Sequence, residues 1–232
     1  MNCVKTRTSL FGRGLTAVAI SLLLVGCATA PEPESTSAEQ SPEAFNAVLP
    51  AGPVTQNPYS QGAPPSVSRT ISRDFQAALT AMDKQRWSQA RPILQAIVAQ
   101  APELTAPWLN LGIVWTQLDE PGQAQAAFER ALAANPLNVD AYNHLAALQR
   151  RQGEFAAAEQ LYQDALAVWP HSVASHKNLG ILYDLYTGRW PRALLHYQAA
   201  QYIIEQTQGQ PDPTLAGWII DLQRRIAAGG PL

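Results

Sequence analysis

The strongest constraint on this chain is a spacing of 34 residues that returns through its middle. Pro102, Pro136 and Pro170 are separated by this step. Other columns keep it in a fixed order: Ala90, Ala124 and Ala158, then Leu94, Phe128 and Tyr162, then Leu111, Leu145 and Leu179. A period of about 20 to 50 residues is typical of stacked repeats rather than of a domain with a single core.

Each repeat has the pattern of two helices with a break between them. Trp108, Leu111 and Trp115 recur at steps of three and four, which places them on one face of a helix. The second half of the unit shows the same spacing, and Pro121-Gly122 separates the two halves. A lone hairpin cannot bury its apolar face, so the hairpins must stack. We predict hairpins at residues 71–104, 105–138, 139–172 and 173–207.

The columns resemble the tetratricopeptide repeat. The best copy, residues 105–138, carries Trp108, Leu111, Gly112, Ala124, Phe128, Ala131 and Pro136 at the signature positions. The fourth copy slips by one residue after Tyr183, so that Ala193 and Tyr197 continue the pattern late. The resemblance implies an all-α fold, a right-handed α-solenoid of about four helical hairpins.

The small residues of one column should let the two helices of a hairpin approach closely. These residues are Gly112, Ala146 and Gly180. The aromatic residues Phe128, Tyr162 and Tyr197 are expected to be core residues that fill the remaining space.

Residues 1–26 have the pattern of an export signal. Lys5, Arg7 and Arg13 precede an apolar run that is too short to span a bilayer. The run ends at Leu24-Val25-Gly26-Cys27, which resembles the lipobox of bacterial lipoproteins. The alternative is an ordinary signal peptide that happens to be followed by a cysteine.

The lipobox resemblance implies that Cys27 becomes the first residue and carries a covalent lipid. Several acyl chains, palmitate among them, would hold the protein on a membrane. Ala28 follows the cysteine where an Asp would resemble the inner-membrane retention signal. We therefore expect the outer membrane, with the protein facing the periplasm, and the inner membrane as the alternative.

Residues 27–70 are predicted to be a lipidated cysteine followed by a disordered linker. The segment is rich in Pro, Ser and Thr and has few large apolar residues with which to form a core. Two short apolar islands, residues 45–49 and 54–59, are either docking motifs or without a role. The linker would let the repeats search for a partner at a distance from the membrane.

Residues 208–232 are predicted to form a capping helix and a tail. Leu215, Trp218, Ile219, Leu222 and Ile226 share one helix face. Repeat arrays need such a helix to cover their last apolar surface. An amphipathic helix on the membrane surface is the alternative, although it would carry more Lys and Arg.

Composition and motifs argue against several functions. The formal net charge of −2 argues against nucleic acid as a partner. The two cysteines, Cys3 and Cys27, are assigned to the signal and the lipid, which leaves no thiol for a disulfide or a zinc site. The sequence has no known catalytic, phosphate-binding or dinucleotide motif. We therefore expect no enzyme, no catalytic residue, no metal, no cofactor beyond the lipid on Cys27 and no small-molecule substrate.

Binding of a protein or peptide is the expected activity. In arrays that this chain resembles, the first helices of the hairpins line a groove. That register predicts groove residues at Asn110, Ile113, Asn143, His144, Arg150, Lys177 and Asn178. Asn side chains can bond to a peptide backbone, and Arg150 and Lys177 can meet a carboxylate. The alternative is that these residues are only the solvated face of the helices.

The predicted function is therefore that of a lipid-anchored periplasmic scaffold for protein-protein interaction. The resemblance suggests an assembly or docking factor for an envelope complex of the pilus or secretin type. The alternative is a non-catalytic adaptor or regulator of peptidoglycan enzymes.

Overall fold

A computed structural model describes residues 42–62 and 66–229, with side chains from residue 44 onward. This part of the chain is helical and contains no β-strand. The predicted export signal, Cys27 and the first part of the predicted linker lie outside the described residues. Among the described helices, none combines the length and the apolar character needed to cross a membrane.

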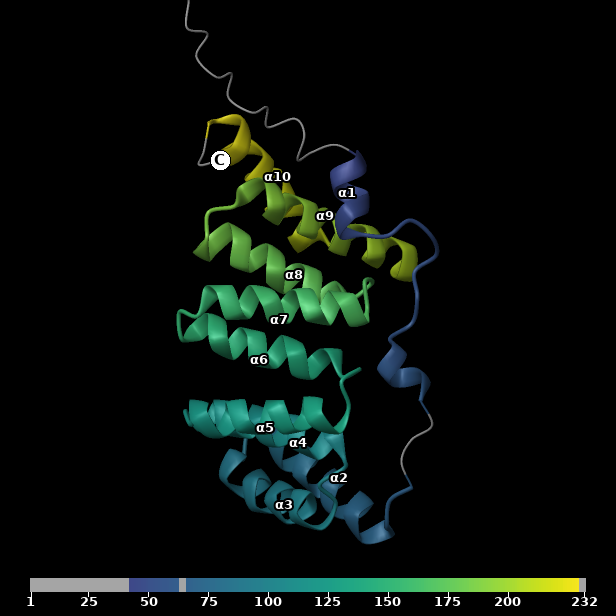
Figure 1. The fold of residues 1–232 in the computed structure, drawn as a ribbon, viewed down its shortest axis with the longest axis vertical. Coiled ribbons are helices and arrows are strands. Elements are labelled where there is room, and N and C mark those ends of the chain that lie inside the picture. The colour runs from purple at the N-terminus through teal and green to yellow at the C-terminus, as the bar shows by residue number, and fades with distance from the viewer. Residues whose placement is uncertain (1–41, 63–65, 230–232) are drawn as a thin grey trace, which may run out of the picture. The chain divides into compact units, whose positions relative to one another are not determined.

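Four helical hairpins follow one another along the chain (Figure 1). They are α2 (Arg69–Asp83) with α3 (Trp87–Gln100), α4 (Thr105–Gln117) with α5 (Pro121–Ala134), α6 (Val139–Arg151) with α7 (Phe155–Val168), and α8 (Val173–Ile181) with α9 (Trp190–Gln208). Each hairpin packs on the next, since α3 contacts α4, α5 contacts α6 and α7 contacts α8. The predicted all-α solenoid of helical hairpins is confirmed.

Local sequence signals explain where these helices begin and end. The side chains of Ser68, Asn138 and Ser172 each accept a hydrogen bond from a backbone N–H of the first turn of α2, α6 and α8. The third hairpin turns at Gly153, whose φ of 85° is in the left-handed region that glycine adopts without strain. The fourth hairpin turns at Gly188 in the same way, with φ of 66°.

The two helices of a hairpin approach closely at the column of small residues, as predicted. A methyl group added to Gly112 would lie 2.4 Å from the Phe128 ring, and one added to Gly180 would lie 2.5 Å from the Tyr197 ring. Both rings are almost completely buried. The aromatic column is therefore core, because each ring packs directly over the backbone of the facing helix.

The fourth hairpin absorbs its extra residue in a short π-helix. α8 continues into η2 (Leu182–Tyr186), where the N–H of Thr187 donates to the carbonyl of Leu182, five residues earlier. A π-turn takes up one residue more than an α-turn, and so it restores the alignment of the following helix. The slip after Tyr183 thus changes the backbone locally without breaking the stack.

α10 (Pro213–Ala227) covers the last hairpin. Its Leu215 and Leu222 are fully buried in one cluster with Tyr197, Ala200 and Ile204 of α9. Asp212 caps its first turn by accepting hydrogen bonds from two backbone N–H groups. A helix that closes the apolar end of the array agrees with the predicted capping helix.

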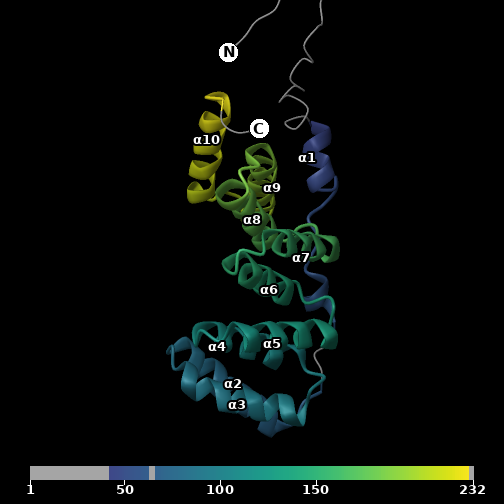
Figure 2. The same ribbon diagram turned by 60° about the vertical axis from the view of Figure 1, so that its left-hand side comes forward.

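The segment before the array differs from the disordered linker that its composition predicts. Residues 42–48 form α1 (Pro42–Val48), which contacts α9, and residues 58–61 form the short 3-10 helix η1 (Pro58–Gln61). Figure 2 shows α1 and α10 on different sides of α9. Leu49 is only 2% exposed because it packs against Ala199 and Ile203. A few apolar anchors are enough to order a segment when a preformed surface receives them.

Candidate protein-binding surface

The first helices of successive hairpins lie next to one another. α4 contacts α6, and α6 contacts α8. The seven residues predicted to line a groove lie on these helices: Asn110, Ile113, Asn143, His144, Arg150, Lys177 and Asn178. Their contacts divide them into residues that hold the array together and residues that are available to a partner.

Asn143 and Asn178 hold two first helices together. The side-chain nitrogen of Asn143 donates to Ser175 Oγ at 2.8 Å and to the Val139 carbonyl at 3.0 Å. Its Oδ1 accepts a hydrogen bond of 3.3 Å from Asn178 Nδ2. Asn143 is only 7% exposed, so its amide forms hydrogen bonds between α6 and α8 and is not available to the backbone of a bound peptide.

Three other predicted groove residues contact their own hairpin or a neighbouring one. Asn110 donates to the Ala106 carbonyl at 2.8 Å, one turn earlier in α4. Ile113 belongs to the cluster around Phe128. The ring of His144 stacks on the Phe128 ring, with the centroids 5.6 Å apart, and its outer side remains exposed.

Lys177 interacts with the C-terminal helix. Its Nζ is 3.7 Å from the Asp212 carboxylate and 5.7 Å from the centroid of the Trp218 ring. The pair is partly exposed, so it contributes little to stability. Lys177 nevertheless has a carboxylate partner already, which makes it a weaker candidate for a carboxylate of another protein.

Arg150 is the predicted groove residue whose charge has no carboxylate partner among the described residues. Its guanidinium lies over the Tyr186 ring, 5.2 Å from the centroid, and its Nε is buried without a hydrogen bond. Burial raises the pKa of the Tyr162 phenol to about 12, although the nearby charge of Arg150 acts in the opposite direction and lowers this pKa. The terminal nitrogens of Arg150 are therefore the donors that remain for an incoming carboxylate.

Two exposed apolar side chains lie in η2, the element whose Tyr186 contacts Arg150. Leu185 is 68% exposed and Tyr186 is 44% exposed, and the Tyr186 ring contacts Phe155 at a centroid distance of 5.4 Å. We call Arg150, Phe155, Leu185 and Tyr186 the Arg150 patch. A guanidinium among accessible aromatic and aliphatic side chains is typical of the centre of a protein-protein interface.

Leu185 and Tyr186 are not among the residues that the repeat register predicts. Both residues lie in η2, where the extra residue shifts every following position relative to the repeat. Register rules transferred from the other units therefore could not place them. The one-residue slip after Tyr183 was the available signal, since π-turns inside helices are frequent at functional sites.

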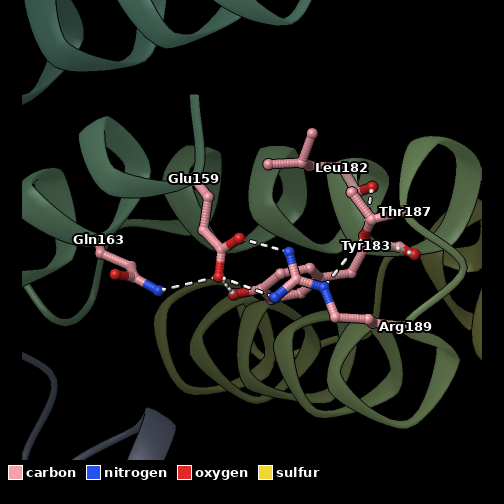
Figure 3. Close-up of polar contacts among 6 residues, drawn as sticks. All are labelled: Glu159, Gln163, Leu182, Tyr183, Thr187 and Arg189. Atoms are coloured by element: carbon pink, nitrogen blue, oxygen red, sulfur yellow. Dashed lines mark hydrogen bonds and ion pairs between the residues drawn. The ribbon is translucent and has the colours of Figure 1, made fainter. Parts of the chain in front are cut away.

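A polar cluster fixes the turn that follows the patch (Figure 3). Arg189 binds the Glu159 carboxylate of α7 with two terminal nitrogens and lies 4.4 Å from the centroid of the Tyr183 ring. Tyr183 donates its hydroxyl to Glu159 Oε1 at 2.7 Å. These contacts join α7 to the turn between η2 and α9 and so limit the movement of η2.

The same cluster determines the charge state of Glu159. Burial raises the pKa of this carboxyl. The hydrogen bonds from Arg189 and Tyr183, together with the Arg189 charge, lower the pKa by more than burial raises it, so the pKa lies below its usual range. Glu159 is therefore ionised at neutral pH, as the ion pair requires.

The described residues include no group of three or more His, Cys, Asp or Glu side chains that could hold a metal ion. His176 and His196 form a buried pair, with 3.0 Å between their Nδ1 atoms. Desolvation lowers the pKa of His176 to about 4 and that of His196 to about 3. Both rings are thus neutral at physiological pH.

Known proteins share this architecture and part of this sequence. A tetratricopeptide repeat family model matches residues 116–173 and again residues 148–211. Over 77 residues the chain is 35% identical to Tetratricopeptide repeat protein 8 of Homo sapiens, a stretch that is 33% of this chain and only 14% of that protein.

Solved structures agree in fold. The crystal structure of MamA superposes with a TM-score of 0.55 at 22% identity, over 60% of this chain and 81% of that chain. The pilF structure of Pseudomonas aeruginosa gives 0.59 at 19% identity, over 68% and 69%. The family model identifies residues 116–211 of this chain as tetratricopeptide repeats, and the solved structures show the same fold.

Proposed function

We propose that this protein is a lipid-anchored, non-catalytic scaffold of the bacterial envelope that captures a segment of another protein. The Arg150 patch carries the proposal. It combines a cation without a carboxylate partner among the described residues with exposed Leu185 and Tyr186 on a stacked array. Tetratricopeptide arrays serve as protein-protein interaction scaffolds, so a binding surface of this kind fits the family.

The chemistry of the patch defines the partner segment. A carboxylate would bind the terminal nitrogens of Arg150 in a bidentate manner, and an apolar side chain next to it would cover Tyr186 and Leu185. A segment with an acidic residue, or a chain terminus, adjacent to a large apolar residue meets both requirements. We expect such a segment to belong to a protein of an envelope assembly of the pilus or secretin type.

The proposed location rests on the N-terminal sequence rather than on the described residues. The motif Leu24-Val25-Gly26-Cys27 would place a lipid on Cys27, and Ala28 favours the outer membrane with the array facing the periplasm. A single acyl chain gives only marginal membrane binding, whereas several chains hold a protein stably. The segment between the anchor and the array would set how far the patch can reach.

The anchor and the binding surface are tested separately. Mass spectrometry of the mature N-terminus should find an acylated Cys27, and Cys27→Ser should move the protein to the soluble fraction. An unmodified cysteine in a soluble protein would contradict the anchor.

Capture of a partner from detergent extracts of the envelope tests the surface. Arg150→Glu should reduce capture strongly, because it repels the carboxylate. Arg130→Glu, an exposed arginine on the second helix α5, is the matched control and should leave capture unchanged. Pilus or secretin proteins in the bound fraction support the proposed assembly role, whereas peptidoglycan enzymes would replace it by a regulatory role.

A further inference from the structure

Residues 42–62, here called the strap, dock on the array as a peptide ligand would. The strap begins with α1 on α9 and continues past the turn between α7 and α8 toward α2 (Figure 1). Phe45 meets the Tyr202 ring edge to face at 6.2 Å, and Leu49 packs with Ala199 and Ile203. Phe45, Val48 and Leu49 thus present one apolar helix face to α9.

The strap is also held through its backbone. The Trp169 indole N–H donates to the Thr55 carbonyl at 3.0 Å. The N–H of Thr55 donates to His171 Nδ1 at 3.2 Å, and its hydroxyl lies 2.9 Å from the same nitrogen. Apolar anchors combined with main-chain hydrogen bonds are the usual means by which a folded domain holds a peptide.

α1 leaves part of its site empty. A cavity of about 580 Å³ lies beside it, between α1, α7, α8 and α9. Its walls are mainly apolar and are lined by Leu166, Leu179, Leu195 and Pro170 on the array side. On the α1 side, the wall includes the small side chains of Ala44 and Ala47. A cavity of this size and character is large enough for several further apolar side chains.

Polar groups that line this cavity include a hydrogen-bond acceptor and hydrogen-bond donors. His176 Nε2 is 2.9 Å from the Pro170 carbonyl, which can only accept, so the His176 proton is on Nε2. The proton between the two Nδ1 atoms then belongs to His196, which leaves His196 Nε2 as an acceptor. Arg192, which also lines the cavity, supplies donors.

We propose that α1 is an exchangeable occupant, and that this groove binds an amphipathic helix of a partner protein with large apolar residues at the positions of Ala44 and Ala47. The helix would present an aromatic residue in place of Phe45 and aliphatic residues in place of Val48 and Leu49. An acidic residue facing Arg192 would add a charge-assisted bond. Because α1 fills the groove incompletely, a partner with larger side chains gains contacts that α1 does not make.

The strap competes with such a partner because it is part of the same chain. A tethered segment has an effective concentration on the order of millimolar, so a partner helix must bind better than α1 to displace it. The short, alanine-containing α1 should therefore keep weakly binding ligands out of the groove, whereas a tightly binding partner helix should displace it. This inference goes beyond the proposed function and does not depend on Arg150.

The test uses a labelled synthetic peptide of residues 42–62 and fluorescence anisotropy. Its targets are the full chain and a chain opened by Phe45→Ala and Leu49→Asp, with far-UV circular dichroism showing that the array remains folded. We expect the peptide to bind the opened chain saturably, and to bind the parent at least about tenfold more weakly, since the parent groove is occupied. Tyr202→Ala in the opened chain should weaken binding.

A second pair of peptides tests the cavity itself. Ala47→Leu in the peptide should improve binding about tenfold, because it adds apolar atoms that the cavity can bury. Asn46→Leu is the matched control, since Asn46 is exposed and does not line the cavity, and it should give no such gain.

Three results would overturn the proposal. A folded opened chain that does not bind the peptide would show that α1 is not exchangeable. Equal affinities for the Ala47→Leu and Asn46→Leu peptides would show that the cavity takes no part. A parent chain that dimerises by exchanging straps would assign the groove to a second copy instead of a partner protein.

Discussion

Asn143, which was predicted to bind a ligand, instead joins two neighbouring hairpins of the array. Its amide joins α6 to α8 through Ser175 and Asn178, and all of these contacts are within the chain. The repeat register correctly predicted that Asn143 lies on a first helix. It could not show that Ser175 would meet it, because that contact depends on how far apart two neighbouring hairpins lie.

Asn143→Ala should lower the free energy of unfolding by about 1 to 3 kcal/mol, because Ser175 and Asn178 lose their buried partner. Asn110→Ala is the matched control, since the Asn110 amide bonds only within its own helix, and it should cost less than about 1 kcal/mol. Urea unfolding followed by circular dichroism measures both. Equal losses would contradict a role for Asn143 in joining the hairpins.

The buried pair of His176 and His196 makes stability depend on pH. Both folded pKa values, about 4 and about 3, lie below the value of 6.5 for a free histidine. The unfolded chain therefore binds more protons, so the pair stabilises the fold above pH 6.5 and loses this contribution as the pH falls toward the folded values.

We expect the free energy of unfolding to fall by about 5 kcal/mol between about pH 7 and about pH 4.5, with each histidine contributing about half. The double variant His176→Phe and His196→Phe should show a smaller fall, because it removes both groups and keeps aromatic rings in the core. Urea unfolding at the two pH values measures this difference. An unchanged pH dependence in the double variant would assign the effect to other residues.

At the scale of secondary-structure elements, close helix pairing depends on glycine where a ring lies over the backbone. Gly180→Ala should destabilise the array by about 1 to 3 kcal/mol, because the new methyl group would lie 2.5 Å from the buried Tyr197 ring. Gly122→Ala should instead stabilise it by up to about 1 kcal/mol, since nothing lies within 4 Å of the added methyl group and α5 gains helix propensity.

Thermal unfolding of the two glycine variants gives a direct comparison, with opposite shifts of Tm expected. A rise of Tm in Gly180→Ala would mean that the Tyr197 ring can move aside at little cost. The column of small residues would then not control how closely the helices pack.

Much of this architecture was predictable from the sequence. Helices α4 to α7 follow from the apolar spacing and from the breaks at Pro121 and Gly153, because both signals are local. The slip after Tyr183 indicated an extra residue in the fourth unit. It did not indicate whether a longer turn or a π-helix would absorb it, since periodicity counts residues and does not define hydrogen bonds.

At the scale of the whole described chain, the docking of the strap depends on contacts that composition does not reveal. The strap has the composition of a disordered segment, yet it packs on α9 through Leu49 and accepts a hydrogen bond from Trp169 at Thr55. Those anchors have partners more than a hundred residues away in the chain, as the bond between Trp169 and Thr55 shows. Sequence patterns within a segment therefore could not predict its docking.

Only part of the candidate surface could be predicted from the sequence. The register placed Arg150 on a first helix correctly, and its lack of a carboxylate partner among the described residues makes it the strongest member of the predicted set. The apolar half of the patch was missed because Leu185 and Tyr186 lie within the π-helix. The proposed function depends on both halves, so it concerns the surface shared by the third and fourth hairpins rather than one repeat.

Site-specific photocrosslinking in the native envelope tests whether the Arg150 patch binds a partner protein. A photoreactive phenylalanine derivative replaces Tyr186 in the Arg150 patch or, as the control, Arg130 on the exposed face of α5. If the Arg150 patch binds the partner, position 186 should give a discrete crosslinked protein that is absent from position 130 and is lost when Arg150→Glu is added. Crosslinks from position 130 with none from position 186 would show that the Arg150 patch is not where this scaffold binds its partner.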